Sequence, residues 1–274
     1  MKDIIGGNFA GFQWQFWPPQ AVRVVNWNID RGLKLAEIID FLASQRADLI
    51  TLQEADLNAK RTRHLNIAEE IARKLEMNYV FGREFQELTQ GSRSSPAFHG
   101  QATLSRWRLR DARLIRFRRQ SDFWRPRWFL PETKPFQERL GGRIALVAEL
   151  EAAGRGLIVY NLHLESRGNE NLRFSQLEET LDDARNHIET PVLVAGDLNF
   201  NISDGSAPSL LDRTGFRSVF GQSRFYTRPA KLFGSPRSID WAVISGGVQA
   251  ESPQAHSDVG ASDHYPISFT LRFG

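Results

Sequence analysis

Hydrophobic residues follow two spacings along this chain, one typical of strands and one typical of helices. Short apolar runs predict strands, and apolar residues three or four positions apart predict amphipathic helices. The predicted strands are 21–26, 48–53, 79–81, 101–105, 113–118, 143–150, 157–164, 191–195, 238–244 and 265–272. The predicted helices are 33–45, 65–75, 170–186 and 208–213. Alternating strands and helices, with a run of neighbouring strands between them, predict an α/β fold in which helices cover mixed sheets.

The segments between these elements predict a single domain over residues 1–274. Stretches that contain Gly, Ser and Pro have the length of loops rather than of linkers, at 90–97, 203–208, 234–238 and 245–260. Aromatic residues crowd the N-terminal segment 1–20, at Phe12, Trp14, Phe16 and Trp17. We expect this segment to pack on the body of the domain, and a partner-binding arm is the alternative.

Polar side chains gather where the predicted strands end or begin. Each such residue, taken alone, is commonly a helix cap or a turn residue. Strand ends, however, place side chains on loops that a rigid sheet holds, which is where active sites tend to lie. Because the arrangement recurs at six places, it predicts a site built from these residues: Asn28, Asp30, Glu54, Asp56, His163, Glu165, Asp197, Asn199, Asp240, Asp263 and His264.

The residue types in this set indicate hydrolysis at phosphorus. The chain has no cysteine, which excludes disulfides, thiolate metal sites, iron–sulfur clusters and cysteine nucleophiles. Carboxylate and amide oxygens suit Mg²⁺, which keeps several water ligands. A metal that neutralises phosphoryl charge, a carboxylate that orients or deprotonates water, and an imidazolium that holds negative charge would complete such a site.

Seven motifs, in order along nearly the whole chain, resemble the endonuclease/exonuclease/phosphatase superfamily. They are NWNIDRG, LQEAD, GQATLSRW, YNLHLES, VAGDLNF, SIDWAVI and ASDHYPI. The resemblance implies a four-layered α/β sandwich, in which two mixed, mainly antiparallel sheets pack face to face with helices outside. It also implies a hydrolase that acts on phosphoester bonds and depends on Mg²⁺, with Mn²⁺ as a possible substitute.

The resemblance also implies a role for each site residue. The metal would lie among Asn28, Asp30, Glu54 and Asp263, with Glu54 as its principal ligand. The catalytic residues would be His163, Asp197, Asn199, Asp240 and His264.

In these implied roles, Asp197 positions or deprotonates the attacking water, and Asn199 holds a phosphate oxygen. His163 contacts the scissile phosphate, and Asp240 orients His264. Members of the superfamily differ on whether the aspartate or the histidine is the base, so both Asp197 and His264 stay open for that role.

Charge is unevenly distributed, although the net charge of the chain is only +3. Residues 105–128, here called the arginine stripe, hold nine arginines and two aspartates, a net +7, which leaves −4 on the other 250 residues. Such a stripe often attracts polyanions, and the alternative is a solvated strand pair with outward arginines.

The expected substrate is therefore an anionic phosphate ester, and we expect a nuclease acting on DNA or RNA. Phosphotyrosyl-DNA is an alternative, because WNIDRG, LQEAD and HLESRG are similar to the second class of tyrosyl-DNA phosphodiesterases. A sphingomyelin-like lipid, an inositol phosphate and a non-catalytic role in polyanion binding are the others. The N-terminus lacks the pattern of a secretory signal, and no apolar run approaches the roughly 18 residues of a spanning helix. We expect a monomeric, cytoplasmic protein.

Overall fold

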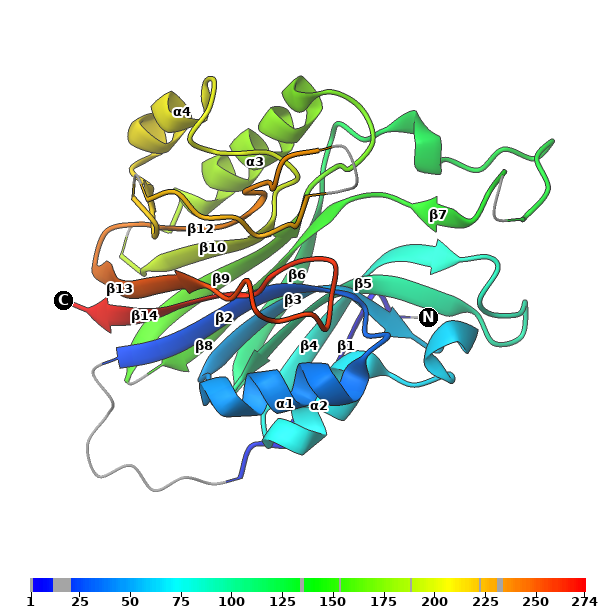
Figure 1. Ribbon diagram of the computed structural model, residues 1–274, viewed down its shortest axis with the longest axis horizontal. Helices are drawn as coiled ribbons and strands as arrows, with labels where there is room; N and C mark the ends of the chain where they lie inside the picture. The colour runs from blue at the N-terminus through cyan, green and yellow to red at the C-terminus, as the bar shows by residue number, and fades with distance from the viewer. Residues whose placement is uncertain are drawn as a thin grey trace.

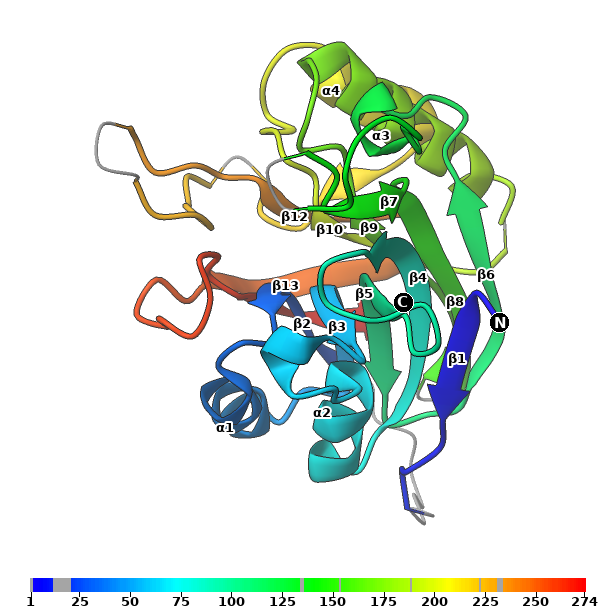
Figure 2. The same cartoon turned by 90° about the vertical axis from the view of Figure 1, so that its right-hand side faces the viewer.

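Two β-sheets pack face to face, and two helices cover the outer face of each sheet (Figure 1; Figure 2). The computed structural model describes residues 2–11, 21–133, 136–152, 154–187, 189–221, 223–230 and 234–274. It confirms the four-layered α/β sandwich. The predictions for Phe12, Trp14, Phe16 and Trp17 lie outside the described residues. Within the described ranges, no helix is long and apolar enough to span a membrane.

The sheets differ in size and share one design. The first sheet has the order β1 (Ile4–Gly7), β4 (Asn78–Glu87), β5 (Ala97–Ser105), β3 (Leu49–Leu57), β2 (Ala21–Arg31), β14 (Ile267–Phe273) and β13 (Val248–Ala255), with β7 (Arg139–Gly141) beside β4. The second has the order β11 (Arg217–Ser218), β12 (Asp240–Ile244), β10 (Val192–Asp197), β9 (Arg155–His163), β8 (Ile144–Ala152) and β6 (Leu109–Arg116). The helices are α1 (Leu35–Gln45), α2 (Ile67–Leu75), α3 (Glu170–Ala184) and α4 (Ala207–Thr214), and two short 3₁₀ helices span Lys60–Thr62 and Asp122–Trp124.

Each sheet holds one parallel pair of strands, joined by a helix that crosses its outer face. In the first sheet α1 joins β2 to β3, and in the second α3 joins β9 to β10. The other pairs in both sheets are antiparallel. A parallel pair brings the carboxyl ends of both strands to one edge of the sheet, where ligands commonly bind. The four central strands therefore carry the polar strand ends of the sequence to the same place.

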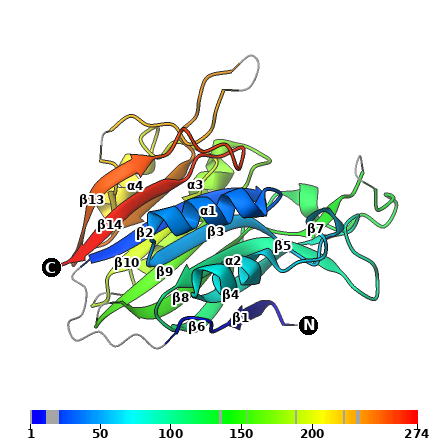
Figure 3. The same cartoon turned by 60° about the horizontal axis from the view of Figure 1, so that its bottom comes forward.

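Strand β2 shows how the alternation of side chains builds the layers. Val22 and Val24 pack in the core between the sheets, whereas Val25 and Trp27 pack under α1 and α2. Figure 3 shows these two helices lying across the first sheet. Successive side chains of a strand point to opposite faces, so the even-numbered residues of β2 face the second sheet.

Three buried polar side chains, Asn26, Gln53 and Asn161, lie between the sheets and are here called the seam. Gln53 Nε2 donates hydrogen bonds to Asn26 Oδ1 (2.9 Å) in its own sheet and to Asn161 Oδ1 (2.7 Å) in the other. Asn161 Nδ2 in turn donates to the main-chain oxygens of Leu52 (3.1 Å) and Ala102 (2.8 Å). Because a buried polar group without a partner is costly, this seam fixes how one sheet lies on the other.

Two central strands run further than the sequence predicts. The expected ends at residues 26 and 53 precede the polar residues, yet β2 continues to Arg31 and β3 to Leu57. The pairing register shifts after Asn28 in β2 and after Leu52 in β3. Such bulges let a strand continue past an interruption and re-aim its side chains. The polar residues of these motifs thus lie inside irregular strands rather than after regular ones.

The prediction of a loop over 245–260 was wrong for Val248–Ala255, which forms β13. This strand lies at the edge of the first sheet and pairs only with β14 in the described part of the chain. Its register shifts between Glu251 and Gln254, around Pro253, a residue that sheets accept at edges and bulges. An edge strand with most side chains exposed shows little hydrophobic alternation, so the sequence gives no clear sign of it.

We predict that Asn161→Ala lowers the free energy of unfolding by about 2–3 kcal/mol, because Gln53 and two main-chain oxygens lose a buried partner. Urea unfolding followed by circular dichroism measures the change. Gln249→Ala, at an exposed position on β13, is the control and should shift stability by less than about 0.5 kcal/mol. Equal stability of Asn161→Ala and wild type would contradict a structural role for the seam.

Candidate active site

The carboxyl ends of the four central strands meet at one edge of the sandwich. Asn28 Nδ2, at the end of β2, donates a hydrogen bond to Asp197 Oδ2 at the end of β10 (3.1 Å). His163 Nε2, at the end of β9, lies 3.9 Å from Glu54 Oε1 of β3 and 3.6 Å from Asp197 Oδ2. Four residues that the sequence separates widely thus converge from both sheets.

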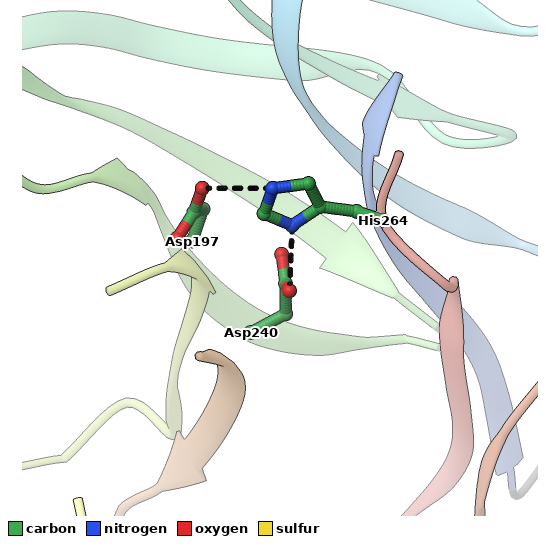
Figure 4. Close-up of side chains that lie close together, drawn as sticks. All are labelled: Asp197, Asp240 and His264. Atoms are coloured by element: carbon green, nitrogen blue, oxygen red, sulfur yellow. Dashed lines mark hydrogen bonds and ion pairs between the residues drawn. The ribbon is translucent and has the colours of Figure 1, made fainter. Parts of the chain in front are cut away.

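His264 lies between two carboxylates (Figure 4). Its Nδ1 is hydrogen-bonded to Asp240 Oδ2 at 2.8 Å, and its Nε2 lies 3.7 Å from Asp197 Oδ2. Asp197 and Asp240 stand opposite each other on the paired strands β10 and β12. Trp27 Nε1 donates to the main-chain oxygen of His264 (2.9 Å), which anchors the loop before β14 to the first sheet.

The two carboxylates determine the charge of this imidazole. Burial alone would lower the pKa of His264, but Asp240 and Asp197 outweigh it and raise the pKa to about 9. Burial also raises the pKa of Asp197, against the opposing charge of His264. Near neutral pH, His264 is therefore an imidazolium, and Asp197 binds a proton more readily than an ordinary aspartate does.

The same three residues offer ligand atoms within 4.8 Å of one another, a spacing that could also suit a metal ion. An imidazole binds a metal only in its neutral form. Because Asp240 engages Nδ1 of His264 and favours the charged ring, the arrangement is better suited to moving and holding protons than to binding a metal.

His163 has the opposite charge state. It is buried, with Nδ1 lying 3.7 Å from Glu84 Oε2, but its neighbourhood includes the buried guanidinium of Arg143, which donates to Glu84 Oε1 (2.6 Å). Burial and then Arg143 hold the pKa of His163 well below its usual value, although Glu54 opposes them. The imidazolium that the sequence leads us to expect in this site is thus His264, whereas His163 is a neutral ring.

Asn199 reaches the site through an unusual backbone conformation. Its φ is +57°, and its main-chain N–H donates to Asp197 Oδ1 (2.9 Å). Its side-chain Nδ2 donates to the main-chain oxygen of Leu164 (3.1 Å), which links the ends of β9 and β10. A left-handed conformation at a residue other than glycine is uncommon, and such residues concentrate at functional sites.

Glu54 stands at the bulge in β3 with a φ of +57° and a side chain 21% exposed. Arg31 Nη1 lies 3.7 Å from its Oε2, and His99 Nε2 lies 3.9 Å from the same oxygen. Burial would raise the pKa of Glu54, but His99 and the guanidinium of Arg31 hold it well below its ordinary value. Glu54 is therefore ionised at neutral pH.

Asp30 and Asp263 complete the acidic side of the site. Asp30 pairs with its neighbour Arg31, and Asp263 Oδ2 accepts a hydrogen bond from Arg228 Nη2 (2.7 Å). Burial raises the pKa of Asp30; Arg31 opposes this, and the negative charges of Asp263 and Glu54 add to it. Three carboxylates thus lie close enough to repel one another.

Two of the polar strand-end residues have other partners. Asp56 Oδ1 and Oδ2 accept hydrogen bonds from the Arg61 guanidinium, both at 2.7 Å, and Oδ1 lies 3.2 Å from His99 Nδ1. Glu165 Oε1 accepts from Trp124 Nε1 at 3.1 Å. Both carboxylates are fully buried, so their contacts indicate that they hold the surrounding loops.

A cavity of about 490 Å³ opens beside these groups. Glu54, His163, Asp197, Asn199 and His264 line it together with aromatic residues of the segment before β7 and a set of arginines. Sequence reasoning missed these arginines, which are Arg31, Arg139, Arg143, Arg167 and Arg228. Arg31 lies within NWNIDRG and Arg167 within HLESRG, so both could have been found, whereas the others carry no local signal.

The arginine stripe is not the source of this positive charge. None of its arginines lines the cavity, and its central part forms the edge strand β6. Five of its nine arginines form ion pairs, namely Arg106 with Asp48, Arg113 with Asp183, Arg116 with Asp3, Arg118 with Glu179 and Arg125 with Asp122. The structure therefore favours the solvated-strand interpretation for most of the stripe.

Comparisons with known proteins agree with this geometry. A sequence model described as the endonuclease/exonuclease/phosphatase family matches residues 25–264. A solved endonuclease/exonuclease/phosphatase from Beutenbergia cavernae DSM 12333 is similar, with 17% identity and a TM-score of 0.65, over 93% of this chain and 72% of that one. The human Nocturnin catalytic domain with bound sulfate anion gives 17% identity and a TM-score of 0.67, over 93% and 95%.

A humanized D. rerio TDP2 with 14 mutations gives 18% identity and a TM-score of 0.62, over 93% of this chain and 100% of that one. At such identities these structures show a shared fold. No curated protein matches the sequence.

We predict that Asp240→Asn lowers the pKa of His264 from about 9 toward its ordinary 6.5, because burial then acts against one carboxylate instead of two. An NMR titration of the His264 ring, with chelator present, measures it. Because the pKa of His264 is higher in the folded state than in the unfolded state, protonation of the ring stabilises the fold. This stabilisation is fully present below pH 6.5 and is lost as pH rises through about 9. The stability difference between wild type and Asp240→Asn should therefore narrow over this range.

Asp258→Asn is the matched control, since it makes the same change at an exposed carboxylate. Asp258 and His264 lie in the same loop before β14. It should leave the titration of His264 as in wild type. A His264 pKa that stays near 9 in Asp240→Asn would show that Asp240 does not determine the charge of the ring.

Proposed function

The chain belongs to the endonuclease/exonuclease/phosphatase family, and we propose that it is a divalent-metal-dependent phosphodiesterase that cleaves nucleic acid. Members of this family are generally phosphoesterases. The observation that carries the proposal is the placement of a charged His264 between Asp197 and Asp240, at the edge of an arginine-lined cavity.

The acidic side of the site fits a divalent cation. Glu54 lines the cavity and is ionised, and Asp30 lies near enough to feel the negative charges of both Glu54 and Asp263. A hard cation would relieve the repulsion among these oxygens, for which Mg²⁺ and Mn²⁺ are suited. We assign the metal to Glu54, with Asn28, Asp30 and Asp263 around it. Arg31 shares these carboxylates and would have to accommodate the ion.

The metal, when bound, would neutralise charge on the phosphoryl group. Asp197 would orient the attacking water and take its proton, since its pKa is raised toward the working range of a base. His264 already carries a proton, which leaves it as the donor of positive charge to the phosphoryl oxygens. Asp240 would keep the ring oriented.

Two neutral groups would contact the same phosphate. His163 lines the cavity as an uncharged imidazole and can donate one N–H. Asn199 lines the cavity beside Asp197, where its left-handed backbone places it. Preorganised donors of this kind stabilise the charge that develops in a transition state and need no rearrangement during the reaction.

The lining of the cavity supports nucleic acid as the substrate. Five arginines supply positive charge to a polyanion, and Phe123, Trp124 and Phe136 border the same cavity. Arg167 lies over the Phe123 ring at 4.7 Å from its centroid. Aromatic rings and arginine planes are the surfaces on which unpaired bases stack. Phosphotyrosyl-DNA also combines phosphate charge with unpaired bases, so it is the alternative substrate.

We predict that removing divalent metal with EDTA abolishes hydrolysis and that adding Mg²⁺ or Mn²⁺ restores it. The assay screens single- and double-stranded DNA and RNA, phosphotyrosyl-DNA, choline lipids and inositol phosphates, each with metal and with chelator. Metal-dependent cleavage confined to lipids or inositol phosphates would overturn the nucleic-acid substrate. No hydrolysis of any of them would overturn the enzyme assignment.

We predict that Asp197→Ala and His264→Ala each lower kcat by roughly 10²-fold or more, the scale of a lost base or a lost electrostatic donor. Circular dichroism checks that both variants are folded. Asp258→Asn, an exposed carboxylate outside the site, should turn over like wild type. Variants of Asp197 and His264 with wild-type turnover would refute the assigned roles.

A further inference from the structure

Two arginines outside the catalytic cavity share a groove that adjoins it. Arg173 lies in the first turn of α3, and Arg237 lies three residues before β12. Both line a groove of about 380 Å³, and Asn199 lines this groove as well as the catalytic cavity. Asn199, the residue assigned to a phosphate oxygen, therefore borders both the catalytic cavity and the groove.

Main-chain contacts hold both guanidinium groups in place. Arg173 Nε donates to the main-chain oxygen of Glu165 (2.8 Å), and Arg237 Nη2 donates to that of Asn199 (3.3 Å). The main chain of Arg237 is itself paired with Arg228 through two hydrogen bonds, each 3.0 Å. Their positions are therefore set by the two loops that carry the catalytic strand ends.

Neither guanidinium has a carboxylate partner within 4.0 Å among the described residues, and the residues outside the described ranges include no Asp or Glu. Burial lowers the pKa of Arg173, and the positive charge of Arg237 lowers it further. The charges of Glu165, Glu170 and Asp197 oppose this shift without outweighing it. The two guanidinium groups thus repel each other and neither is paired with a carboxylate, in contrast to the five paired arginines of the arginine stripe. An anion bound between them would relieve this repulsion.

We propose that Arg173 and Arg237 form a second phosphate subsite, which binds a phosphoryl group adjacent to the one that is cleaved. Guanidinium groups match the geometry of phosphate oxygens and keep their charge at any physiological pH. With Asn199 between the two sites, the subsite selects substrates that carry two phosphoryl groups near each other.

The acidic residues of the groove do not occupy this subsite. Glu170 and Asp204 also line the groove. Asp204 Oδ2 accepts a hydrogen bond from Asn201 Nδ2 (2.8 Å), and neither carboxylate comes within ion-pair distance of Arg173 or Arg237 in the described structure. A phosphoryl group would therefore bind between the two guanidinium groups and Asn199.

This subsite deepens the proposed function and rests on it. A neighbouring phosphodiester of a polynucleotide and a terminal phosphomonoester of a small molecule present the same chemistry. Two short substrates distinguish these sources. TpTpT carries its second phosphoryl group as a diester, whereas pTpT carries its second phosphoryl group as a terminal monoester. TpT and bis(p-nitrophenyl) phosphate carry one phosphoryl group only.

The test compares wild type with Arg173→Gln/Arg237→Gln on these four substrates in the presence of Mg²⁺. We expect kcat/KM of the double variant to fall roughly tenfold or more on two-phosphate substrates, and by a clearly smaller factor on one-phosphate substrates. A larger fall on TpTpT identifies a polynucleotide, and a larger fall on pTpT identifies a terminal phosphate. Equal losses on all four substrates would overturn the subsite and leave the arginines as loop anchors.

Binding provides a readout that needs no turnover. We expect log Kd of a fluorescein-labelled oligothymidylate, measured by anisotropy in EDTA, to depend less steeply on log salt concentration in the double variant, by about 0.7 per lost phosphate contact. Arg213→Gln/Arg272→Gln removes the same charge from two exposed, ion-paired arginines and should keep the wild-type slope. An unchanged slope in Arg173→Gln/Arg237→Gln would overturn the subsite.

The two proposals fail in different ways. If the proposed function is wrong, neither wild type nor any variant hydrolyses a substrate, bis(p-nitrophenyl) phosphate included. If only the subsite is wrong, wild type hydrolyses all of these substrates, and the double variant shows neither a selective loss nor a change in salt slope.

Discussion

The hydrogen bond from Asn28 to Asp197 crosses from one sheet to the other, and the rest of the site depends on it. Neither sheet carries a complete set of catalytic groups, since Glu54 and Asn28 stand on the first and His163 and Asp197 on the second. The groups can meet only if the sheets lie in one register. The buried seam of Gln53, Asn26 and Asn161 continues this bond into the core, where polar groups tolerate few alternative partners. Apolar packing thus brings the two sheets together, and the specific polar contacts set their alignment.

Within that frame, burial acts on two histidines with opposite results. Desolvation disfavours the charged form of both rings, and the neighbouring side chains decide the outcome. His264 faces two carboxylates and keeps its proton, whereas His163 lies beside the buried Arg143 and loses it. A site with one charged and one neutral imidazole can supply both positive charge and an uncharged N–H donor. Such a division of roles follows from the packing around each ring, because the two side chains are chemically identical.

The sequence predicts the layers of the fold and most of the polar residues that converge, because both depend on local pattern. Strand periodicity locates the central strands, and polar residues at their ends mark Asn28, Glu54 and Asp197. Three features depend on non-local contacts and escape that pattern. The bulges in β2 and β3 depend on how these strands pair with their neighbours. The edge strand β13 has mostly exposed side chains, so its sequence shows little hydrophobic alternation from which a strand could be predicted. The charge state of His163 depends on Arg143, which is distant in the sequence and carries no motif.

The distribution of positive charge shows why composition alone is a weak guide to a binding surface. The arginine stripe holds the highest local charge in the chain, yet carboxylates of the N-terminal segment, of α3, of the stripe itself and of Asp48 before β3 engage five of its arginines. Exposed ion pairs contribute little stability, but they reduce the field that a distant anion meets. The arginines at the site come instead from separate segments, and Arg173 and Arg237 have no carboxylate within 4.0 Å in the described structure. In the proposed subsite, a substrate phosphate would be attracted by charge that the fold leaves unpaired next to Asn199, and no count of arginines along the chain can locate that charge.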